Sequence, residues 1–469
     1  MKIHQIATRF KHTALAIGLI GVASQVRAHA SEQGFVLLLP TEFYITSGVA
    51  SVVLTVLLLL VLPERFLAAL FRPLSLPWRR ARHAPLVTSC VAFLLLGFLV
   101  WVGQNGPRDP LANPLVLTVW TLWWIGFVTV QGLLGDLWRW VNPWSGPVAL
   151  TRSLLGVRPF LRLPVWLGHS PAIASFLGFA AILMADPAPT DPARLAGYVG
   201  VYWLLTYLAL LVFGPRWAYR GEGFSVLMRL YARVGLFATG GRRLRAGLLG
   251  WQTLRGPVPP FGVAVFCILM LGSGSFDGLN ETFWWLAQLG VNPLEFPGRS
   301  AVVWHNLAGL LVANAALIGV FAISVWLGLK LAQVDMGLPL AFRVFAPSIL
   351  PIALGYHIAH YYTSFLVDGQ YALAAASDPM ATGQDLLGLG TFYVTTGFFN
   401  TQASVRAIFL VQAGAVVFGH VLAILLAHAV AVRHFGTNRR AALSQAPLAL
   451  FMILYTLFGL WLLASPRGV

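Results

Sequence analysis

The chain has 469 residues, of which 58% are hydrophobic and only 10% are charged, and its mean hydropathy is +0.77. Soluble proteins carry about a quarter charged residues, so this composition excludes a globule in water and predicts an all-α, polytopic integral membrane helix bundle. The net charge of +16 does not indicate a nucleic-acid partner, because the Arg residues lie in short loops between long apolar runs and form no aromatic-interleaved basic patch.

The N-terminus has the pattern of a secretory signal peptide. A basic start precedes the apolar stretch Thr13–Ala23, which is too short to cross a bilayer. Small residues after it allow cleavage following Ala28 or Ala30, and the first cut would make His29 the first mature residue. We therefore expect a signal peptide over the first 30 residues and a transmembrane domain over 31–469.

Apolar runs of about 20 residues predict some ten transmembrane helices after the signal. The predicted spans, in chain order, are 43–62, 86–103, 114–135, 167–185, 195–213, 260–276, 303–329, 344–367, 407–432 and 446–464.

The loops between these spans alternate in charge. Every second loop is rich in Arg or Lys, and the other loops are acidic or nearly neutral. The basic loops are 63–85, 136–166, 214–259, 330–343 and 433–445. Because basic loops stay in the cytoplasm, we expect a bacterial inner-membrane protein with both mature termini in the periplasm. Within the longest basic loop, Phe224–Phe237 is predicted to lie as an amphipathic helix on the membrane surface.

Histidines concentrate in the outer half of the predicted bundle. His357 and His360 are three residues apart and share one helix face, and Tyr361 adds a hydroxyl to that side. Pro351, one to two turns earlier, bends the helix and favours a cavity there. His305 begins the preceding span at a similar depth. We therefore expect the three imidazoles to converge near the outer face.

Carboxylates are expected in the neighbouring outer loops. Asp277 follows span 260–276, and Asp368 follows the His pair. Three imidazoles and one carboxylate suit Zn²⁺ or a similar divalent metal, and an open position on the ion lets bound water ionise near neutral pH. His29 is a candidate fourth imidazole.

Other interpretations of these histidines stay open. Imidazoles in membrane helices also serve as structural hydrogen-bonding groups between helices, or bind another ligand such as haem. For His420 and His428, in span 407–432, the structural interpretation is favoured.

Several segments resemble one family of bacterial membrane proteins, the fenitrothion hydrolases. The matching pieces are Ala28-His29, Asn142-Pro143-Trp144, Phe276-Asp277-Gly278, Ser348–Gln370 and Val411–His428. The resemblance implies hydrolysis of organophosphate triesters and assigns no role to any residue.

The chemistry of the residues is compatible with that activity. A small lipophilic triester dissolves in the lipid bilayer, and a metal-bound hydroxide can attack its phosphorus. We expect His305, His357 and His360, with His29, as metal ligands. Asp277 or Asp368 is expected as ligand or general base, and Tyr361 as support for the leaving aryloxide. The alternative function is transport or handling of copper or zinc, and a scaffold with structural histidines is a further one.

Overall fold

The computed structural model describes residue 36 and residues 38–77, 84–156, 158–240, 243–295, 298–436 and 438–467. The predicted signal peptide, with its cleavage sites and His29, lies outside these residues. Among the described residues, nine helical segments are long and apolar enough to cross a membrane, and a tenth apolar helix is shorter. The prediction of an all-α, polytopic membrane helix bundle is confirmed.

Helices stand at all ten predicted positions. They are α2 (Thr41–Val61), α4 (Ala84–Asn105), the continuous α5 (Pro114–Val116), η1 (Leu117–Phe127) and α6 (Val128–Leu134), α9 (Ser170–Ala185), α10 (Pro192–Phe213), α13 (Phe261–Asn280), α15 (Val303–Leu331), the continuous α16 (Leu338–Phe345), η5 (Ala346–Ile349) and α17 (Leu350–Ser377), α18 (Gln402–Phe435) and α19 (Asn438–Ala464). The predicted boundaries fall short at several ends, because polar residues continue α17 and α18 beyond their apolar stretches.

Shorter elements connect these helices. The helical ones are α3 (Glu64–Leu70), α7 (Trp138–Val141), α8 (Ser145–Leu155), η2 (Val165–Leu167), α11 (Pro215–Arg220), α12 (Gly223–Ala232), α14 (Phe283–Gln288), η3 (Pro293–Glu295), η4 (Arg299–Ala301) and η6 (Gly397–Phe399). Three strands form a small antiparallel sheet in the order β1-β3-β2: β1 (Leu74–Pro77), β2 (Phe237–Gly240) and β3 (Arg243–Ala246). The sheet joins two loops that the sequence predicts on the same side of the bundle.

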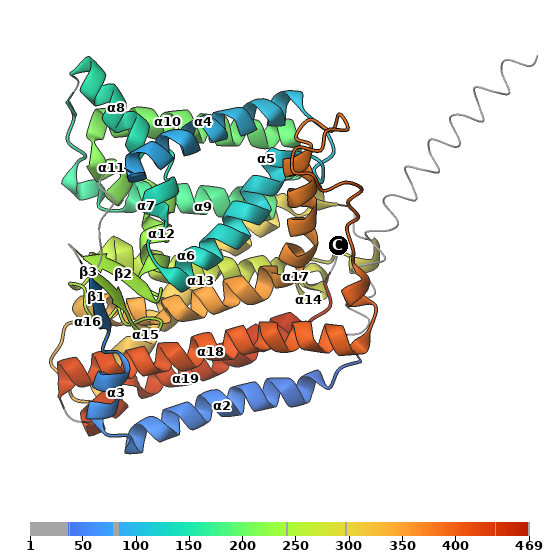
Figure 1. Ribbon diagram of the computed structural model, residues 1–469. Helices are drawn as coiled ribbons and strands as arrows, with labels where there is room; N and C mark the ends of the chain where they lie inside the picture. Colours follow the sequence, from blue (N-terminus) through green and yellow to red (C-terminus); the bar gives the residue numbers. More distant parts are fainter. Residues whose placement is uncertain are drawn as a thin grey trace, which may run out of the picture.

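The helices lie roughly parallel in layers (Figure 1). Helices α2, α18 and α19 pack together at one side, α13, α15 and α17 form the centre, and α4 and α10 pack on each other at the opposite side. Glycines allow α17 and α18 to approach closely: a Cβ at Gly355 would lie 2.4 Å from the carbonyl oxygen of Ala415. Small residues at such contacts are typical of membrane helix packing.

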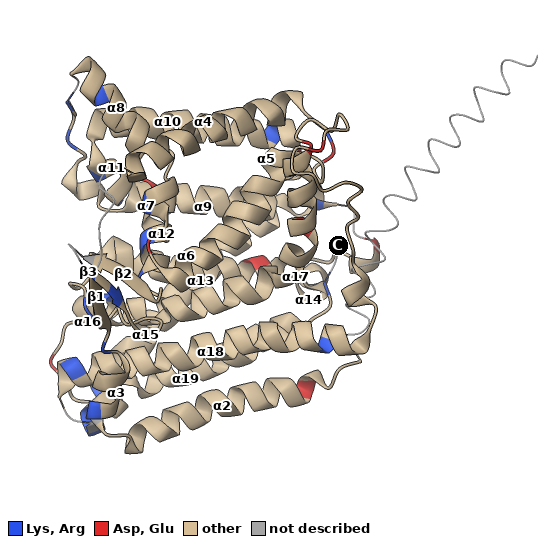
Figure 2. Ribbon diagram, viewed as in Figure 1, with Lys and Arg blue, Asp and Glu red and all other residues tan. Residues whose placement is uncertain are grey.

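Charge is segregated between the two ends of the bundle. Most Lys and Arg residues gather at the end that carries the sheet, and most Asp and Glu residues lie toward the other end (Figure 2). Both ends of the described chain lie at this acidic end, where the amide of Phe283 donates to the carbonyl of Pro466 at 3.0 Å. Two chain ends at the same end of the bundle agree with an even number of membrane crossings between them.

The prediction that the longest basic loop forms a helix on the membrane surface is wrong. Helix α12 is buried almost throughout and packs against α6 and α9 inside the bundle. Glu222 caps the buried helix, because its carboxylate accepts hydrogen bonds from the amides of Phe224 and Ser225 at 2.7 and 2.6 Å. Because the cap satisfies backbone N–H groups at its N-terminus, the helix can lie inside an apolar bundle.

Candidate functional site

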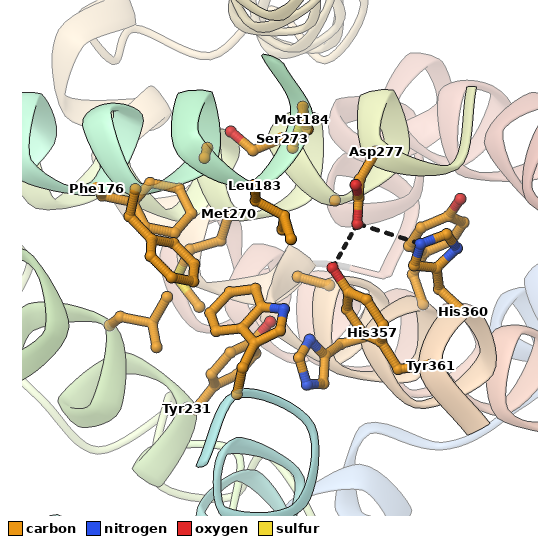
Figure 3. A pocket seen from close by; sticks show the side chains of 17 residues that line it. Phe176, Leu183, Met184, Tyr231, Met270, Ser273, Asp277, His357, His360 and Tyr361 are labelled. Carbon is orange, nitrogen blue, oxygen red and sulfur yellow. Dashed lines mark hydrogen bonds and ion pairs between the residues drawn. The ribbon is translucent and has the colours of Figure 1, made fainter. Parts of the chain in front are cut away.

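A small cavity lies in the centre of the bundle; most of its lining is apolar, and we call it the polar cavity for the ionisable side chains along one wall. Its walls come from η1, α9, α12, α13 and α17, and its volume is about 30 Å³ (Figure 3). A buried water needs about 10–15 Å³ of such space, so the cavity has room for about two water molecules. Its polar lining includes Asp277, His357, His360 and Tyr361, four of the residues that the sequence singles out.

Asp277 is the centre of the polar cluster. Its Oδ2 lies 3.1 Å from His360 Nε2 and accepts a hydrogen bond from the hydroxyl of Tyr361. The side chains of Asp277 and His360 are only 7% and 5% exposed, so bulk water does not share these contacts. Figure 3 shows both contacts converging on one carboxylate oxygen. In a region of low dielectric such pairing is what allows a carboxylate to be buried.

The placement of Asp277 corrects one expectation. The sequence predicts this residue in an outer loop, but it lies in the last turn of α13, which continues to Asn280. A carboxylate near a helix C-terminus is unfavourable because the helix dipole is negative there. The hydrogen bonds from α17 offset this cost, so Asp277 ties the two helices together.

Tyr356 belongs to the cluster and was missed by the sequence analysis. Its ring stacks on that of His360, with centroids 5.8 Å apart, and its buried hydroxyl has no hydrogen-bond partner among the described residues. His360 Nδ1 is also buried without a partner. A Cβ at Gly278 would lie 1.9 Å from the Tyr356 hydroxyl, so only glycine leaves room for that hydroxyl, and 3.6 Å from His360 Nδ1, which is ordinary contact. The i, i+4 spacing of residues 356 and 360 is the signal that could have found Tyr356.

His357 faces a different set of partners. Its ring meets Trp124 of η1 edge to face at 5.1 Å, and its Nε2 has no partner among the described residues. The ring of Tyr361 packs against both imidazoles, at 5.0 Å from His357 and 4.6 Å from His360. The two histidines therefore line one cavity, and the phenol ring of Tyr361 packs against both imidazoles. Trp124 reaches this position from an 11-residue π-helix, a rare backbone form that is frequent at functional sites.

His305 does not join the cluster, so its predicted convergence with the His pair is wrong. The buried face of α15 includes Asn306, Leu310 and Asn314, at helical spacing, and His305 lies outside that face and is exposed. Asn306 takes the inward position instead and donates to the carbonyl of Met184 at 3.0 Å. The prediction therefore failed at the choice of helix face, since the neighbouring residue is the one that turns inward.

Asp368 also lies away from the cluster. It was expected in the loop after the His pair, but α17 continues to Ser377 and contains it. Asp368 is eight residues beyond His360, or about 12 Å along the helix axis at 1.5 Å per residue. It does not line the polar cavity.

These positions bear on the expected metal. Within the described residues, no group of three or more His, Cys, Asp or Glu side chains is placed to hold a metal ion. The donor set that remains at the cavity is one His–Asp contact with a nearby imidazole, which does not fit the expected centre of three imidazoles and a carboxylate.

His420 and His428 lie elsewhere in the bundle and are buried. His428 Nδ1 contacts the side-chain amide of Gln445 on α19, and His420 Nδ1 lies 2.8 Å from the carbonyl of Val416. The contact of His428 with Gln445 agrees with a hydrogen-bonding role between helices. His420 Nε2 has no partner among the described residues, and its ring lies 6.3 Å from that of Tyr455.

A second cavity, of about 910 Å³, lies between α4, η1, α9 and α10 and is almost entirely apolar. Arg194 and Tyr198 line part of it and hydrogen-bond to Asp186, at 2.8 and 2.7 Å. Burial alone would raise the pKa of Asp186, but the hydrogen bonds from these two side chains outweigh it and hold the pKa of that carboxyl below its ordinary value.

No protein-family model, curated protein or solved structure matches the chain. The fold and the site define a multi-pass membrane protein with a buried Asp–His–Tyr cluster next to a water-sized cavity.

Proposed function

We propose that the protein is a membrane-embedded hydrolase of lipophilic esters, with the organophosphate and thiophosphate triesters implied by the sequence resemblance as its substrates. The contact of His360 Nε2 with buried Asp277, beside a cavity with room for water, carries the proposal. A carboxylate that orients one ring nitrogen of a histidine leaves the other nitrogen to act as a general base.

The reaction uses residues that already meet in the cavity. Asp277 accepts a hydrogen bond from His360 Nε2–H, which leaves a lone pair on Nδ1. Nδ1 takes a proton from water as the water oxygen bonds to phosphorus. The bond between phosphorus and the aryloxide breaks, and the proton passes from His360 to the departing oxygen. Water and triester thus give a dialkyl phosphate and a phenol.

Two tyrosines divide the remaining roles. Tyr361 was expected to support the leaving aryloxide, but its hydroxyl is engaged by Asp277. Tyr356 has an unpartnered hydroxyl next to His360 and is the better donor to the oxygen or sulfur that gains charge on phosphorus. No step passes through a metal, because the described residues do not fit the expected centre.

The charge pattern supports a proposal for the location. We propose that the membrane is a bacterial inner membrane and that the basic end faces the cytoplasm, which places the mature termini and the acidic end in the periplasm. The cluster of Asp277 and His360 then lies in the outer half of the bilayer.

The decisive experiment compares two histidine variants of the purified full chain with a chromogenic aryl dialkyl phosphate. We expect His360→Gln to lower turnover by about 10²- to 10⁴-fold, the usual contribution of a general base. His434→Gln, which changes an exposed histidine at the end of α18, is the matched control and keeps full turnover. Full turnover in His360→Gln would refute the proposed base.

A chelator separates this mechanism from the metal-hydroxide mechanism expected from the sequence. We expect hydrolysis to persist after chelation and in His305→Gln, because neither treatment touches the Asp277–His360 contact. Loss of turnover in both tests would restore the metal centre and reject the metal-free base.

Metal-ion transport is a second candidate, favoured by one row of buried polar groups. The Tyr455 hydroxyl donates to Ser275 Oγ at 2.6 Å, two residues from Asp277, and its ring neighbours His420, whose Nε2 has no partner among the described residues. Uptake of labelled Zn²⁺ or Cu⁺ into vesicles, lost in His420→Leu, would support transport. Absence of uptake in the wild-type protein would reject it.

A further inference from the structure

The large apolar cavity has the size and lining of a small-molecule site. Its volume of about 910 Å³ falls within the usual range of about 300–1,000 Å³ for ligand pockets. Aromatic rings line much of it beside aliphatic side chains, and they include five indoles: Trp120, Trp123, Trp138, Trp144 and Trp203. Broad aromatic walls suit a ring-bearing ligand better than a single hydrocarbon chain, because rings gain from edge-to-face and offset contacts.

The cavity opens on the flank of the bundle. Leu95 of α4 and Val201 and Leu205 of α10 line it, and these side chains are 53%, 60% and 60% exposed. In a membrane-spanning chain this flank faces hydrocarbon, so a ligand enters from the lipid. Such a ligand has to be soluble in the bilayer.

The polar groups at the cavity suit a neutral ligand. The guanidinium of Arg194 is paired with Asp186, and the carboxylate of Glu222, next to the cavity, accepts from the Tyr202 hydroxyl and two backbone amides. Arg194 and Glu222 are thus both paired, so the site offers no unpaired charge to a ligand.

Phe179 separates this cavity from the polar one. Of the described residues it alone lines both, and its ring packs against Trp124 and Phe224 at centroid distances of 4.7 and 5.0 Å. This side chain of α9 therefore lies where the two spaces come closest in their linings. The polar cavity, at about 30 Å³, is too small to hold an ester by itself.

We propose that the cavity between α4, η1, α9 and α10 binds a neutral, ring-bearing lipophilic molecule that enters from the bilayer, and that Phe179 is the partition between this site and the Asp277–His360 cluster. The identity of the ligand as the ester substrate rests on the proposed function. The binding site itself does not.

Two glycines allow the cavity to be filled without disturbing its walls. Gly178 and Gly197 line it, and a Cβ at either position would meet no atom within 4 Å. Gly178→Leu and Gly197→Leu therefore place a side chain in the open space. Gly319→Leu on α15 is the matched control, because a Cβ there also meets nothing within 4 Å and the residue does not line the cavity.

The test is photolabelling of the full chain in phospholipid vesicles with a neutral aryl diazirine. We expect saturable labelling of peptides from α4 and α10, competed by an excess of an aryl dialkyl phosphate. Both cavity-filling variants should weaken saturable labelling at least tenfold, and Gly319→Leu should retain it. Equal saturable labelling in all three variants would overturn the site.

Two further arms separate the possible failures. His360→Gln should label as the wild type does, and labelling that survives the loss of hydrolysis would support a binding site distinct from the Asp277–His360 cluster. Hydrolysis by the wild type without saturable labelling would overturn the binding site and leave the proposed hydrolase function standing. A diazirine on a phospholipid acyl chain should label these peptides weakly. Strong labelling by that lipid, not displaced by the aryl phosphate, would make the cavity a lipid site and reject the proposal.

Discussion

At the scale of single residues, the centre of this protein is a carboxylate that the bilayer would otherwise exclude. Asp277 is stabilised in the bundle by a contact with His360 and a hydrogen bond from Tyr361, both from the facing helix α17. Ionisable groups at membrane depth are costly and usually functional. The neighbouring atoms that lack partners, Tyr356 Oη and His360 Nδ1, indicate where a ligand or water would bind.

Replacement of Asp277 tests whether this carboxylate orients the His360 imidazole or binds the substrate. Asp277→Asn keeps the shape but removes the charge that stabilises a protonated His360, so we expect kcat on an aryl phosphotriester to fall about 10²- to 10⁴-fold with little change in KM. Steady-state kinetics of the purified variant measure this split. A rise in KM at constant kcat would instead assign Asp277 to substrate binding.

Gly278 provides a steric test of the same cluster. A methyl group at residue 278 would overlap the Tyr356 hydroxyl, at 1.9 Å, and overpacking of this kind costs about 1–3 kcal/mol. We expect Gly278→Ala to lower the thermal unfolding temperature in detergent. Adding Tyr356→Phe removes the overlapping oxygen and should restore that temperature, and a double variant no more stable than Gly278→Ala would contradict this packing.

At the scale of elements, the loop between α17 and α18 is ordered by its own carboxylates. Asp385 accepts hydrogen bonds from the amides of Leu389 and Gly390 at 2.7 and 2.8 Å, and from Ser377 Oγ at 2.8 Å. The amide of Gly390, followed by Ser377 and Leu389, lowers the pKa of Asp385 below its ordinary value. These contacts need the charged form of the carboxyl.

The order of this loop should therefore depend on pH. A carboxyl whose pKa is lowered by folding stabilises the fold above its unfolded pKa and loses that contribution as the pH falls through the lowered value. We expect Asp385→Ala to expose the loop to proteases at neutral pH, and the wild-type loop to become cleavable only in more acidic solution. Limited proteolysis with mapped fragments measures both, with Asp335→Ala as the control, and a resistant Asp385→Ala loop would contradict the prediction.

The sequence predicted the helices far better than it predicted their faces. The apolar runs were enough to place all ten helices, because span length is set by the bilayer. His357 and His360 were expected on one helix face and both are buried, but His305 points outward and Asn306 takes the inward position. Burial of α12 could not be predicted either, since it depends on the cap that Glu222 provides inside the bundle.

The partners of the site were hidden for a similar reason. Trp124 and Phe179 lie on helices that are apolar on all sides, so no periodicity distinguishes the face that meets α17 or the large cavity. The Asp277–His360 contact joins residues 83 positions apart, and only the packing of α13 on α17 brings them together. Local pattern specifies local structure and depth, and tertiary packing decides which groups meet.

At the scale of the whole molecule, the proposed function requires both cavities. The apolar cavity opens toward lipid, and the polar cavity holds room for water and the ionisable groups. Among the described residues, Phe179 is the side chain that lines both cavities, which is why the proposed partition falls on it.

The orientation of the bundle is the last prediction. Gln384 lies in the loop after α17, and Asp335 lies between α15 and α16. Both residues are exposed, and they flank opposite ends of the continuous α16–α17 helical segment. Because the basic end is expected in the cytoplasm, Gln384→Cys should react with a membrane-impermeant maleimide in intact cells stripped of their outer membrane. Asp335→Cys should react only after the inner membrane is opened, and the wild-type chain, whose Cys267 is buried and Cys90 half-buried, is the control for background. The opposite labelling pattern would invert the topology, move the Asp277–His360 cluster to the cytoplasmic half, and require the ester to be hydrolysed on that side.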